Sequence, residues 1–219
     1  WVAEANTGRA RRLEGVRLNA VTTSGFQWMP DSRTLLCVLV PAGRGTPPQP
    51  PAFPEGPVVQ ENFGRPAPAP TFQDLLSNAH DEDLFDYYAT GQLALVDSAT
   101  GRVTPIGQPK IFDSVEPSPD GRHILVEHVH RPYSYLLPLA RFPREIEVWD
   151  LSGRLVKSIA SLPLREDVPL GGVPTGPRNV GWVPTEPAAL YWVEALDDGD
   201  PRKKVPHRDR VLWLAAPFS

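Results

Sequence analysis

The chain has 219 residues, a formal net charge of −4 at pH 7 and 41% apolar residues, a globular composition that excludes wholesale disorder. A slightly negative chain lacks the basic stripe that phosphate neutralisation requires, so we predict no nucleic-acid partner. The longest apolar run, residues 35–40, is far shorter than the ~20 residues that span a bilayer, so we predict no membrane partner.

Proline is the outlier of the composition, at 27 of 219 residues against a usual ~5%. An interior proline removes a backbone donor and clashes with the preceding turn, so this frequency disfavours long helices and favours an all-β chain. The single cysteine, Cys37, allows no intrachain disulfide and is interpreted as a small buried hydrophobe. Cysteine usage leaves the compartment open between the cytoplasm and a periplasmic or secreted location.

Two kinds of segment recur along the chain. The first is a proline, a short polar turn and an apolar strand, at residues 28–40, 117–129 and 182–194. The second is a strand, a turn that begins with Asp or Asn and ends in Gly, and a second strand, at 1–13, 93–106 and 146–159, with a half copy at 211–218. Asp bonds to its own local backbone and Gly accepts positive φ, so the second kind indicates β-hairpins.

The two kinds of segment alternate at a fixed spacing. They lie 27 residues apart at 119 and 146 and again at 184 and 211, but 63 apart at 30 and 93. A repeated unit of two hairpins is typical of propeller blades, so we predict an all-β partial β-propeller of about three to four four-stranded blades in an incomplete ring. Its predicted parts are a hairpin at 1–15, a blade at 16–108 with an insertion at 41–90, a blade at 109–163 and a truncated blade at 178–219. Five tryptophans at strand positions are predicted to pack between blades, namely Trp28, Trp149, Trp182, Trp192 and Trp213.

Both ends of the chain fall within a predicted blade, and the first residue is Trp1 rather than Met. We therefore expect a fragment of a longer protein from which an N-terminal part has been removed. The insertion begins with a proline-rich stretch at 41–70, which we interpret as an extended surface loop. It continues with one or two short helices predicted within 71–92, with Thr71 as the expected N-cap.

Catalytic and metal-binding motifs are weak in this sequence. No GxSxG motif, which would hold a serine at a strand-to-helix turn, occurs in the 219 residues, so we predict no catalytic residue. His128 and His130 share a face of an expected strand, but zinc needs three or four ligands. Residues 81–83 lack the glycine and spacing of a calcium loop and are interpreted as a solvated acidic turn. We predict no metal site and no cofactor.

Four segments carry a specific resemblance. They are HRPYSYLLPLARFPREIEVWD at 130–150, YYATGQLALVD at 87–97, VPTGPRNVGW at 173–182 and LYWVEALDDGDP at 190–201, together with the Pro-Asp-Gly turn at 119–121. The chain resembles, over most of its length, the glutamyl endopeptidase branch of the prolyl oligopeptidase family of serine peptidases. The resemblance implies a peptidase that cleaves peptide substrates after glutamate, in which a propeller covers an α/β-hydrolase domain and filters what reaches its Ser, Asp and His. That hydrolase domain lies outside the matched segment, so no triad residue is carried over.

A glutamate-selective peptidase needs a fixed cation, and the planar fork of arginine binds a carboxylate through two hydrogen bonds. The candidate substrate-binding residues are Arg131, Tyr133, Arg141 and Arg178. Arg131 and Arg141 bracket a loop rich in Pro, Tyr and Leu, and binding residues concentrate on loops carried by rigid scaffolds. The alternative for each arginine is a surface ion pair with an acid such as Glu145 or Asp150.

Two hypotheses for the function remain. The first is a gating propeller that positions peptides for a separate hydrolase domain of the same parent chain and is inactive alone. The second is a non-enzymatic propeller whose loops bind a protein partner. A downstream reading frame with GxSxG and a later His favours the first, and an early stop codon favours the second.

Overall fold

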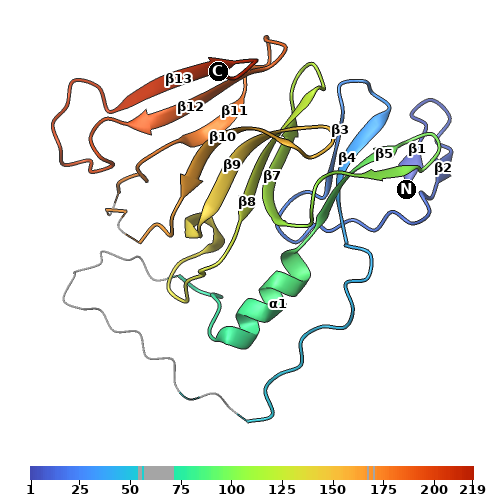
Figure 1. The fold of residues 1–219 in the computed structure, drawn as a ribbon, viewed down its shortest axis with the longest axis horizontal. Coiled ribbons are helices and arrows are strands. Elements are labelled where there is room, and N and C mark those ends of the chain that lie inside the picture. Colours follow the sequence, from blue (N-terminus) through green and yellow to red (C-terminus); the bar gives the residue numbers. More distant parts are fainter. Residues whose placement is uncertain (54–55, 57–71, 167, 170) are drawn as a thin grey trace.

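A computed structural model describes residues 1–53, 56, 72–166, 168–169 and 171–219. These residues form four antiparallel sheets, one α-helix and one 3₁₀ turn (Figure 1). The prediction of an all-β fold is confirmed. Thr71 and much of the proline-rich stretch lie outside the described residues.

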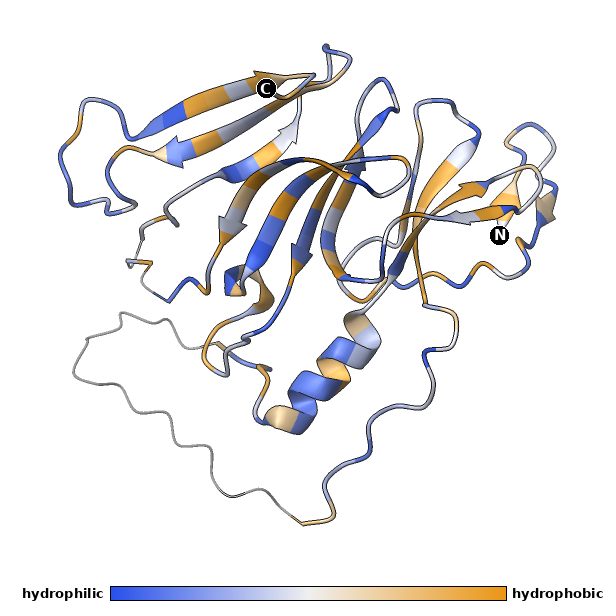
Figure 2. Ribbon diagram, viewed as in Figure 1, coloured by the Kyte–Doolittle hydropathy of each residue, from blue (hydrophilic) through white to orange (hydrophobic). Residues whose placement is uncertain are grey.

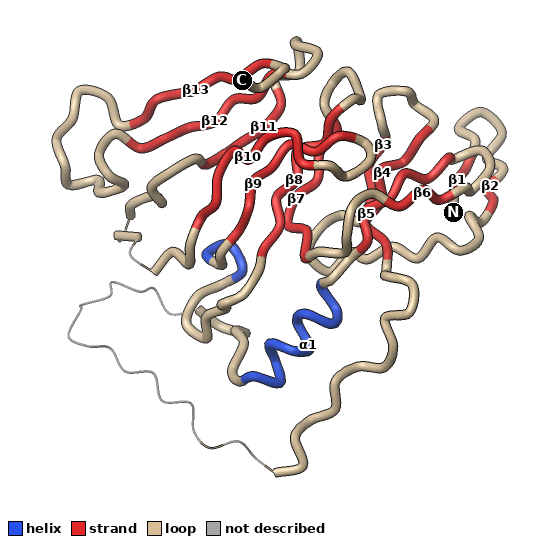
Figure 3. The backbone as a smooth tube through the Cα atoms, viewed as in Figure 1, coloured by secondary structure: helices blue, strands red, loops and turns tan. Residues whose placement is uncertain are grey.

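Strand order follows chain order in every sheet, as the tube in Figure 3 shows. A small hairpin pairs β1 (Val2–Ala3) with β2 (Ala10–Arg11). Sheet I contains β3 (Phe26–Trp28), β4 (Thr34–Leu39), β5 (Gln92–Asp97) and β6 (Val103–Pro105). Sheet II contains β7 (Ile111–Pro117), β8 (His123–Val129), β9 (Arg144–Asp150) and β10 (Leu155–Leu162). Sheet III contains β11 (Arg178–Trp182), β12 (Ala189–Ala195) and β13 (Asp209–Ala215).

Aspartates hold the short turns that join neighbouring strands. Asp31 Oδ1 accepts the backbone N–H groups of Arg33 at 2.9 Å and Thr34 at 2.8 Å between β3 and β4. Asp97 and Asp150 accept backbone N–H groups in the same way after β5 and β9. These are local bonds between a side chain and the backbone that follows it, which is why the sequence pattern predicts the turns correctly.

The turn after β9 gives stability a dependence on pH. Hydrogen bonds from Ser152 and Arg154 hold the pKa of Asp150 at about 2, whereas an unfolded chain gives Asp a pKa of ~3.9. The stabilisation from a lowered carboxyl pKa is fully present above about pH 4 and is lost as the pH falls through about 2. We expect Asp150→Asn to lower the thermal midpoint at pH 7 and the difference from wild type to shrink between those values. Curves for wild type and Asp150→Asn that stay parallel down to pH 2 would contradict this cause.

The three large sheets stack face to face. Successive side chains of a strand point to opposite faces, and the consecutive apolar residues Ile124, Leu125 and Val126 of β8 therefore serve both cores; Figure 2 shows the hydrophobic residues along this sheet. The core between sheets I and II consists of Met29, Leu36, Val38, Leu93, Ile106, Phe112, Val115, Ile124, Val126 and Trp149. The core between sheets II and III consists of Leu125, Ile146, Val148, Leu162, Trp182, Ala188, Leu190 and Phe218.

Hydrogen bonds join the first strands of the three sheets. Gln27 Nε2 on β3 donates to the backbone carbonyl of Val115 on β7. Trp182 Nε1 on β11 donates to the carbonyl of Glu116 on β7 at 3.0 Å. Strands β3, β7 and β11 therefore lie next to one another along one edge of the stack, and β7 is bonded from both sides.

The tryptophans follow the core prediction only in part. Trp149 and Trp182 are buried between sheets, and Trp192 packs against the core of sheets II and III. The prediction is wrong for Trp28 and Trp213, which are 49% and 55% exposed. Both lie on edge strands, β3 and β13, of the first and last large sheets, and the N-terminal residues that pack on the outward face of sheet I leave Trp28 half exposed.

Helix α1 (Ala79–Ala89) lies within the insertion between β4 and β5. Asn78 is its N-cap, because its side-chain oxygen accepts the backbone N–H of Asp81 at 2.9 Å. The helix predicted within 71–92 is present and shorter than that window. Its buried side packs Phe85 and Ala89 against the cluster that includes Val129 and Phe142, so the helix is attached to sheet II.

Candidate functional site

The two ends of the stacked sheets carry connections of very different length. The end with the aspartate turns has connections of a few residues, such as 98–102 and 151–154. The opposite end carries the connections 40–91, 130–143, 163–177 and 196–208. We call it the long-loop end, and α1 and the 130–143 loop lie there (Figure 3). All four predicted site residues lie at this end, which is where a rigid scaffold places binding loops.

Arg131 binds three carboxylates of α1. Its guanidinium donates to Asp86 Oδ2 at 2.9 Å, to Asp83 Oδ1 at 2.9 Å and to Glu82. The Tyr133 hydroxyl donates to Asp86 as well. Arg131 is therefore an anchor between the 130–143 loop and α1. Arg131 thus forms ion pairs, as in the alternative to substrate contact. Its partners are acids of α1, however, and not Glu145 or Asp150.

Tyr133 belongs to the same anchor. Its ring stacks on Phe142 at 5.0 Å between centroids and meets Phe85 edge-on at 5.1 Å. Burial, followed by the hydrogen bond to Asp86, raises the pKa of Tyr133 above its ordinary value. A buried phenol that donates to a carboxylate, stacks on one ring and meets a second edge-on fixes the shape of the loop.

A structural role of Arg131 can be distinguished experimentally from contact with substrate. We expect Arg131→Gln to speed hydrogen exchange at the amides of α1 by a factor that corresponds to about 1 kcal/mol, because a network of ion pairs is partly exposed there. The preference of the full-length protein for acidic peptides should not change. A changed preference, with unchanged exchange, would show that Arg131 contacts substrate instead.

Arg144, the first residue of β9, lies deep at the long-loop end. Its side chain is 6% exposed, and its Nη1 bonds to Asp113 Oδ2 at 2.7 Å and to Glu127 Oε1. Its Nη2 donates to the carbonyl of Leu139 at 2.8 Å. One guanidinium thus joins β7, β8, β9 and the 3₁₀ turn η1 (Leu139–Arg141). The sequence prediction does not include Arg144 among the site residues.

Arg141 and Arg165 lie beside Arg144 at η1. The backbone N–H of Arg165 donates to the Arg141 carbonyl at 3.0 Å, and Arg165 Nη2 donates to the carbonyl of Ala140. Arg141 Nη1 and Arg165 Nε are both buried, and neither has a hydrogen-bond acceptor within the described residues. Burial, with further contributions from Arg144 and Arg141, lowers the pKa of Arg165. We call Arg141, Arg144 and Arg165 the arginine cluster.

Arg178 opens β11 and pairs with Asp209, the first residue of β13. Its side chain is 18% exposed. Arg178 therefore has a carboxylate partner across sheet III, and the structure does not bring it into the arginine cluster through any described hydrogen bond. Of the predicted residues, Arg141 alone belongs to that cluster. Arg165 was missed because nothing in its local sequence signals its neighbours.

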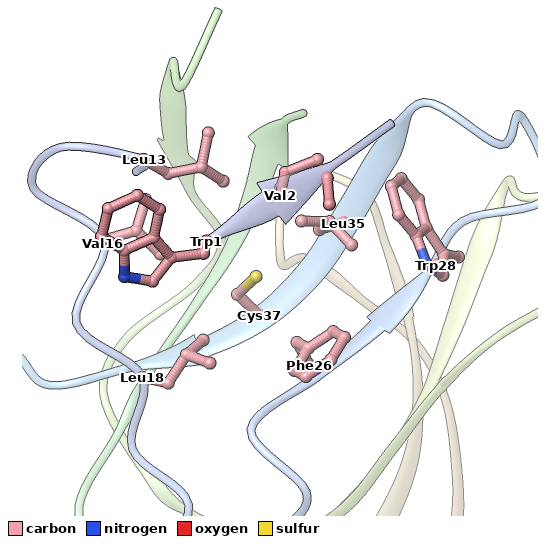
Figure 4. Close-up of a pocket in the computed structure, with 10 residues that line it drawn as sticks. Trp1, Val2, Leu13, Val16, Leu18, Phe26, Trp28, Leu35 and Cys37 are labelled. Carbon is pink, nitrogen blue, oxygen red and sulfur yellow. The ribbon is translucent and has the colours of Figure 1, made fainter. Parts of the chain in front are cut away.

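An apolar hollow of about 220 Å³ lies on the outward face of sheet I (Figure 4). Trp1, Phe26 and Trp28 surround it, and Cys37 lies at its floor. Burial raises the pKa of the Cys37 thiol to about 12, which makes it a poor nucleophile. The outward face of sheet III is also apolar, since Val211 is 71% exposed.

His128 lies on β8 and His130 just after its end, so the two do not share a strand as predicted, and each pairs with a glutamate. His128 Nε2 lies 3.3 Å from Glu147, and His130 Nε2 lies 3.4 Å from Glu145. Burial lowers the pKa of His128 below its ordinary value. In the described part of the chain, no group of three or more His, Cys, Asp or Glu side chains is placed to hold a metal ion. In the same residues, no helix has the length and apolar character to cross a membrane.

Comparisons with known proteins give two curated relatives. The chain is 44% identical over 217 residues, 96% of its length, to a protein of Oryza sativa subsp. japonica named probable glutamyl endopeptidase, chloroplastic. It is 42% identical over 222 residues, 99% of its length, to a protein of the same name from Arabidopsis thaliana. The chain spans 23% of the length of each. No family model matches the chain.

A comparison with solved structures gives a weak likeness. An uncharacterized protein of Listeria monocytogenes EGD-e matches 93% of this chain and 40% of its own, with a TM-score of 0.42 and 11% identity. A match at this level carries no argument about fold or function. The sequence similarity to the two plant proteins is the stronger finding.

Proposed function

We propose that this chain is the non-catalytic, sheet-built part of a longer serine peptidase that cleaves peptides after glutamate. The observation that carries the proposal is the 42–44% identity, along nearly the whole chain, to two proteins named probable glutamyl endopeptidase. The chain spans 23% of the length of each relative, so in this proposal most of the longer protein lies outside these residues. A separate α/β-hydrolase domain supplies the nucleophile in this proposal.

We propose that the stacked sheets are blades of a propeller, at 16–108, 109–163 and 178–219, with the hairpin at 1–15 as part of another. Radial repetition of antiparallel sheets packs each sheet face against the next and lines up the first strands. Sheets I to III pack in this manner, and β3, β7 and β11 are joined by hydrogen bonds at one edge. The apolar outward faces of sheets I and III suit contact with further blades of the longer protein.

The proposed role of these blades is to gate and position peptide substrates. Within the 130–143 loop, Ser134 Oγ accepts the backbone N–H of Leu136 at 3.1 Å. The long-loop end suits peptide contact in this proposal, because binding residues concentrate on loops carried by rigid scaffolds and the long loops of sheets I, II and III lie there. A propeller that lets only narrow, extended chains reach the hydrolase domain would select unfolded peptides over folded proteins.

The test compares substrates that differ only in whether they are folded. The full-length natural protein is incubated with a short glutamyl peptide, with a folded protein that has surface glutamates, and with that same protein after irreversible unfolding. We expect cleavage after glutamate in the short peptide and in the unfolded protein, and an intact folded protein. Equal rates for the folded and unfolded forms would contradict gating. Absence of cleavage after glutamate in all three would contradict the peptidase proposal and favour a binding role.

A further inference from the structure

The turn of the β1–β2 hairpin has the same backbone bonds as the turn between β5 and β6. The Gly8 N–H donates to the Glu4 carbonyl at 2.8 Å, and the Glu4 N–H donates to the Arg9 carbonyl at 3.0 Å. Three residues of the β5–β6 turn form the same two bonds at the same two distances, namely Asp97, Gly101 and Arg102. Because β5 and β6 are the third and fourth strands of sheet I, the β1–β2 hairpin corresponds to the last two strands of a four-stranded sheet.

The N-terminal residues cover only part of the outward face of sheet I. Ala94 and Val96, on the third strand β5, are fully buried in the cluster that Leu13 forms with this face. Phe26 and Trp28, on the first strand β3, are 47% and 49% exposed. They line the apolar hollow of about 220 Å³ that Figure 4 shows. Among the described residues, this face is therefore covered at its third strand and open at its first.

Sheet II shows what covers the first strand of such a face. Phe112 and Val115 on β7, the first strand of sheet II, are buried in a core that they share with Leu36 and Val38 on β4. Strand β4 is the second strand of sheet I, the sheet that precedes sheet II in the chain. A sheet that packed on sheet I in the same manner would place its second strand, with the first strand beside it, over the hollow.

One edge of β1, beside the hollow, pairs with no described strand. The bond between Glu4 and Arg9 makes these residues a hydrogen-bonded pair of the hairpin, and such pairs alternate along an antiparallel ladder. The N–H and C=O of Ala3, one residue before Glu4, therefore point away from β2. Trp1, Val2 and Ala3 line the hollow, so this edge borders it. An edge of this kind can accept a further strand.

The edge of β1 decides between a strand and a small apolar ligand. Burying Phe26 and Trp28 needs only apolar atoms, which a ligand could supply. Only a strand also offers N–H and C=O groups to Ala3. A hairpin of two strands is at best marginally stable by itself, and two more strands would give β1 and β2 the four-stranded arrangement of sheets I and II.

We propose that two further strands of the longer chain fill this hollow, pair with the edge of β1 and complete a four-stranded sheet with β1 and β2. Strand order follows chain order in every described sheet, so these strands belong to the segment that leads directly into Val2. Their apolar side chains, at alternate positions, face Phe26 and Trp28. These strands presuppose the proposed function, in which the chain is part of a longer protein.

The test links the hollow covalently to the segment that lies in it. The full-length natural protein is made with photoreactive benzoylphenylalanine in place of Phe26, irradiated, digested and analysed by mass spectrometry. We expect a cross-link within one chain to the segment directly before Trp1. The control places the same group at Tyr88 on α1, which has a similar exposure of 46%, and should give no link to that segment. A link from the hollow to another part of the chain or to a second copy would overturn the proposal.

Oxidation by hydroxyl radicals measures the cover of the hollow without any substitution. The oxidation rate of each side chain in the native full-length protein is divided by its rate in the unfolded protein. We expect the ratio for Trp28 to be as low as the ratio for Trp149, which is 3% exposed in this chain. A ratio for Trp28 several-fold above that of Trp149 would show an open hollow and would overturn the proposal.

Both measurements are independent of catalysis, so failure of the covering strands can be distinguished from failure of the proposed function. A protein that gives the expected cross-link but takes up no serine-hydrolase probe would support the strands and contradict the peptidase. A protein that cleaves after glutamate but gives no cross-link from the hollow would overturn the strands and leave the peptidase proposal standing.

Discussion

Replacing Arg144 with methionine is expected to destabilise the protein by about 3 kcal/mol, at the lower end of the range for breaking a buried ion pair. The Arg144 side chain is 6% exposed, whereas Asp113 and Glu127 keep 26% and 25% exposure. Methionine fills similar space but leaves two carboxylates and the Leu139 carbonyl without their donor. The two carboxylates stay partly hydrated, so the expected loss of stability lies at the lower end of that range.

The loss should appear at the strands that Arg144 joins. Hydrogen exchange of the full-length protein is expected to show lower protection at β8 and β9 and at the 130–143 loop, with sheet III less affected. Arg144→Lys should recover part of the loss, because an ammonium keeps the charge but not the fork. The exposed control Arg154→Met, whose side chain is 80% exposed beside Asp150, should change stability by less than about 1 kcal/mol. Equal effects of the two methionine variants would contradict the assigned role of Arg144.

Replacing Phe112 with alanine should lower stability by about 3–5 kcal/mol, the usual cost of removing a buried aromatic ring. Phe112 is fully buried between sheets I and II, and its ring meets Trp149 edge-on at 6.2 Å between centroids. The cavity would open at the contact between two sheets. Because that contact orders the two sheets relative to each other, we expect the variant to loosen the packing of sheet I on sheet II as well as to lower the free energy of unfolding.

Two measurements identify this effect. Exchange protection should fall in both sheet I and sheet II, because the cavity is shared by β4, β5, β7 and β8. Phe112→Leu should cost less, because leucine fills part of the volume. The control Leu155→Ala removes a side chain that is 51% exposed on β10, and it should change protection little. A loss confined to sheet II would contradict the proposed packing of sheet II on sheet I.

The sequence predicts the parts of this fold that depend on local chemistry. The turns at Asp31, Asp97 and Asp150 form because each carboxylate bonds to backbone N–H groups within a few residues. Successive side chains of a strand point to opposite faces, so the consecutive apolar residues Ile124 and Leu125 lie on opposite faces of β8, and both are buried. Repeats of turns and strands thus indicate the sheets and their order along the chain.

Properties that depend on distant segments cannot be read from the same patterns. Arg131 meets acids of α1 that lie more than 40 residues earlier, and Arg144 meets Asp113 on another strand. Trp28 is half exposed on the edge strand β3, whereas Trp149 on β9 is buried because it packs in the core between sheets I and II. Which arginines lie together is decided by such long-range contacts, so the sequence prediction names Arg141 and misses Arg165, whose backbone N–H donates to the Arg141 carbonyl.

The most direct test is to locate the reactive serine of the natural gene product. The full-length protein is treated with a fluorophosphonate probe for serine hydrolases, its intact mass is measured, and the modified residue is mapped by peptide mass spectrometry. We predict a product well above the 24.1 kDa of this chain, with the probe on a serine outside residues 1–219. A probe adduct on a serine within these residues, or a protein that takes up no probe, would contradict the proposal that they are the non-catalytic part of a serine peptidase.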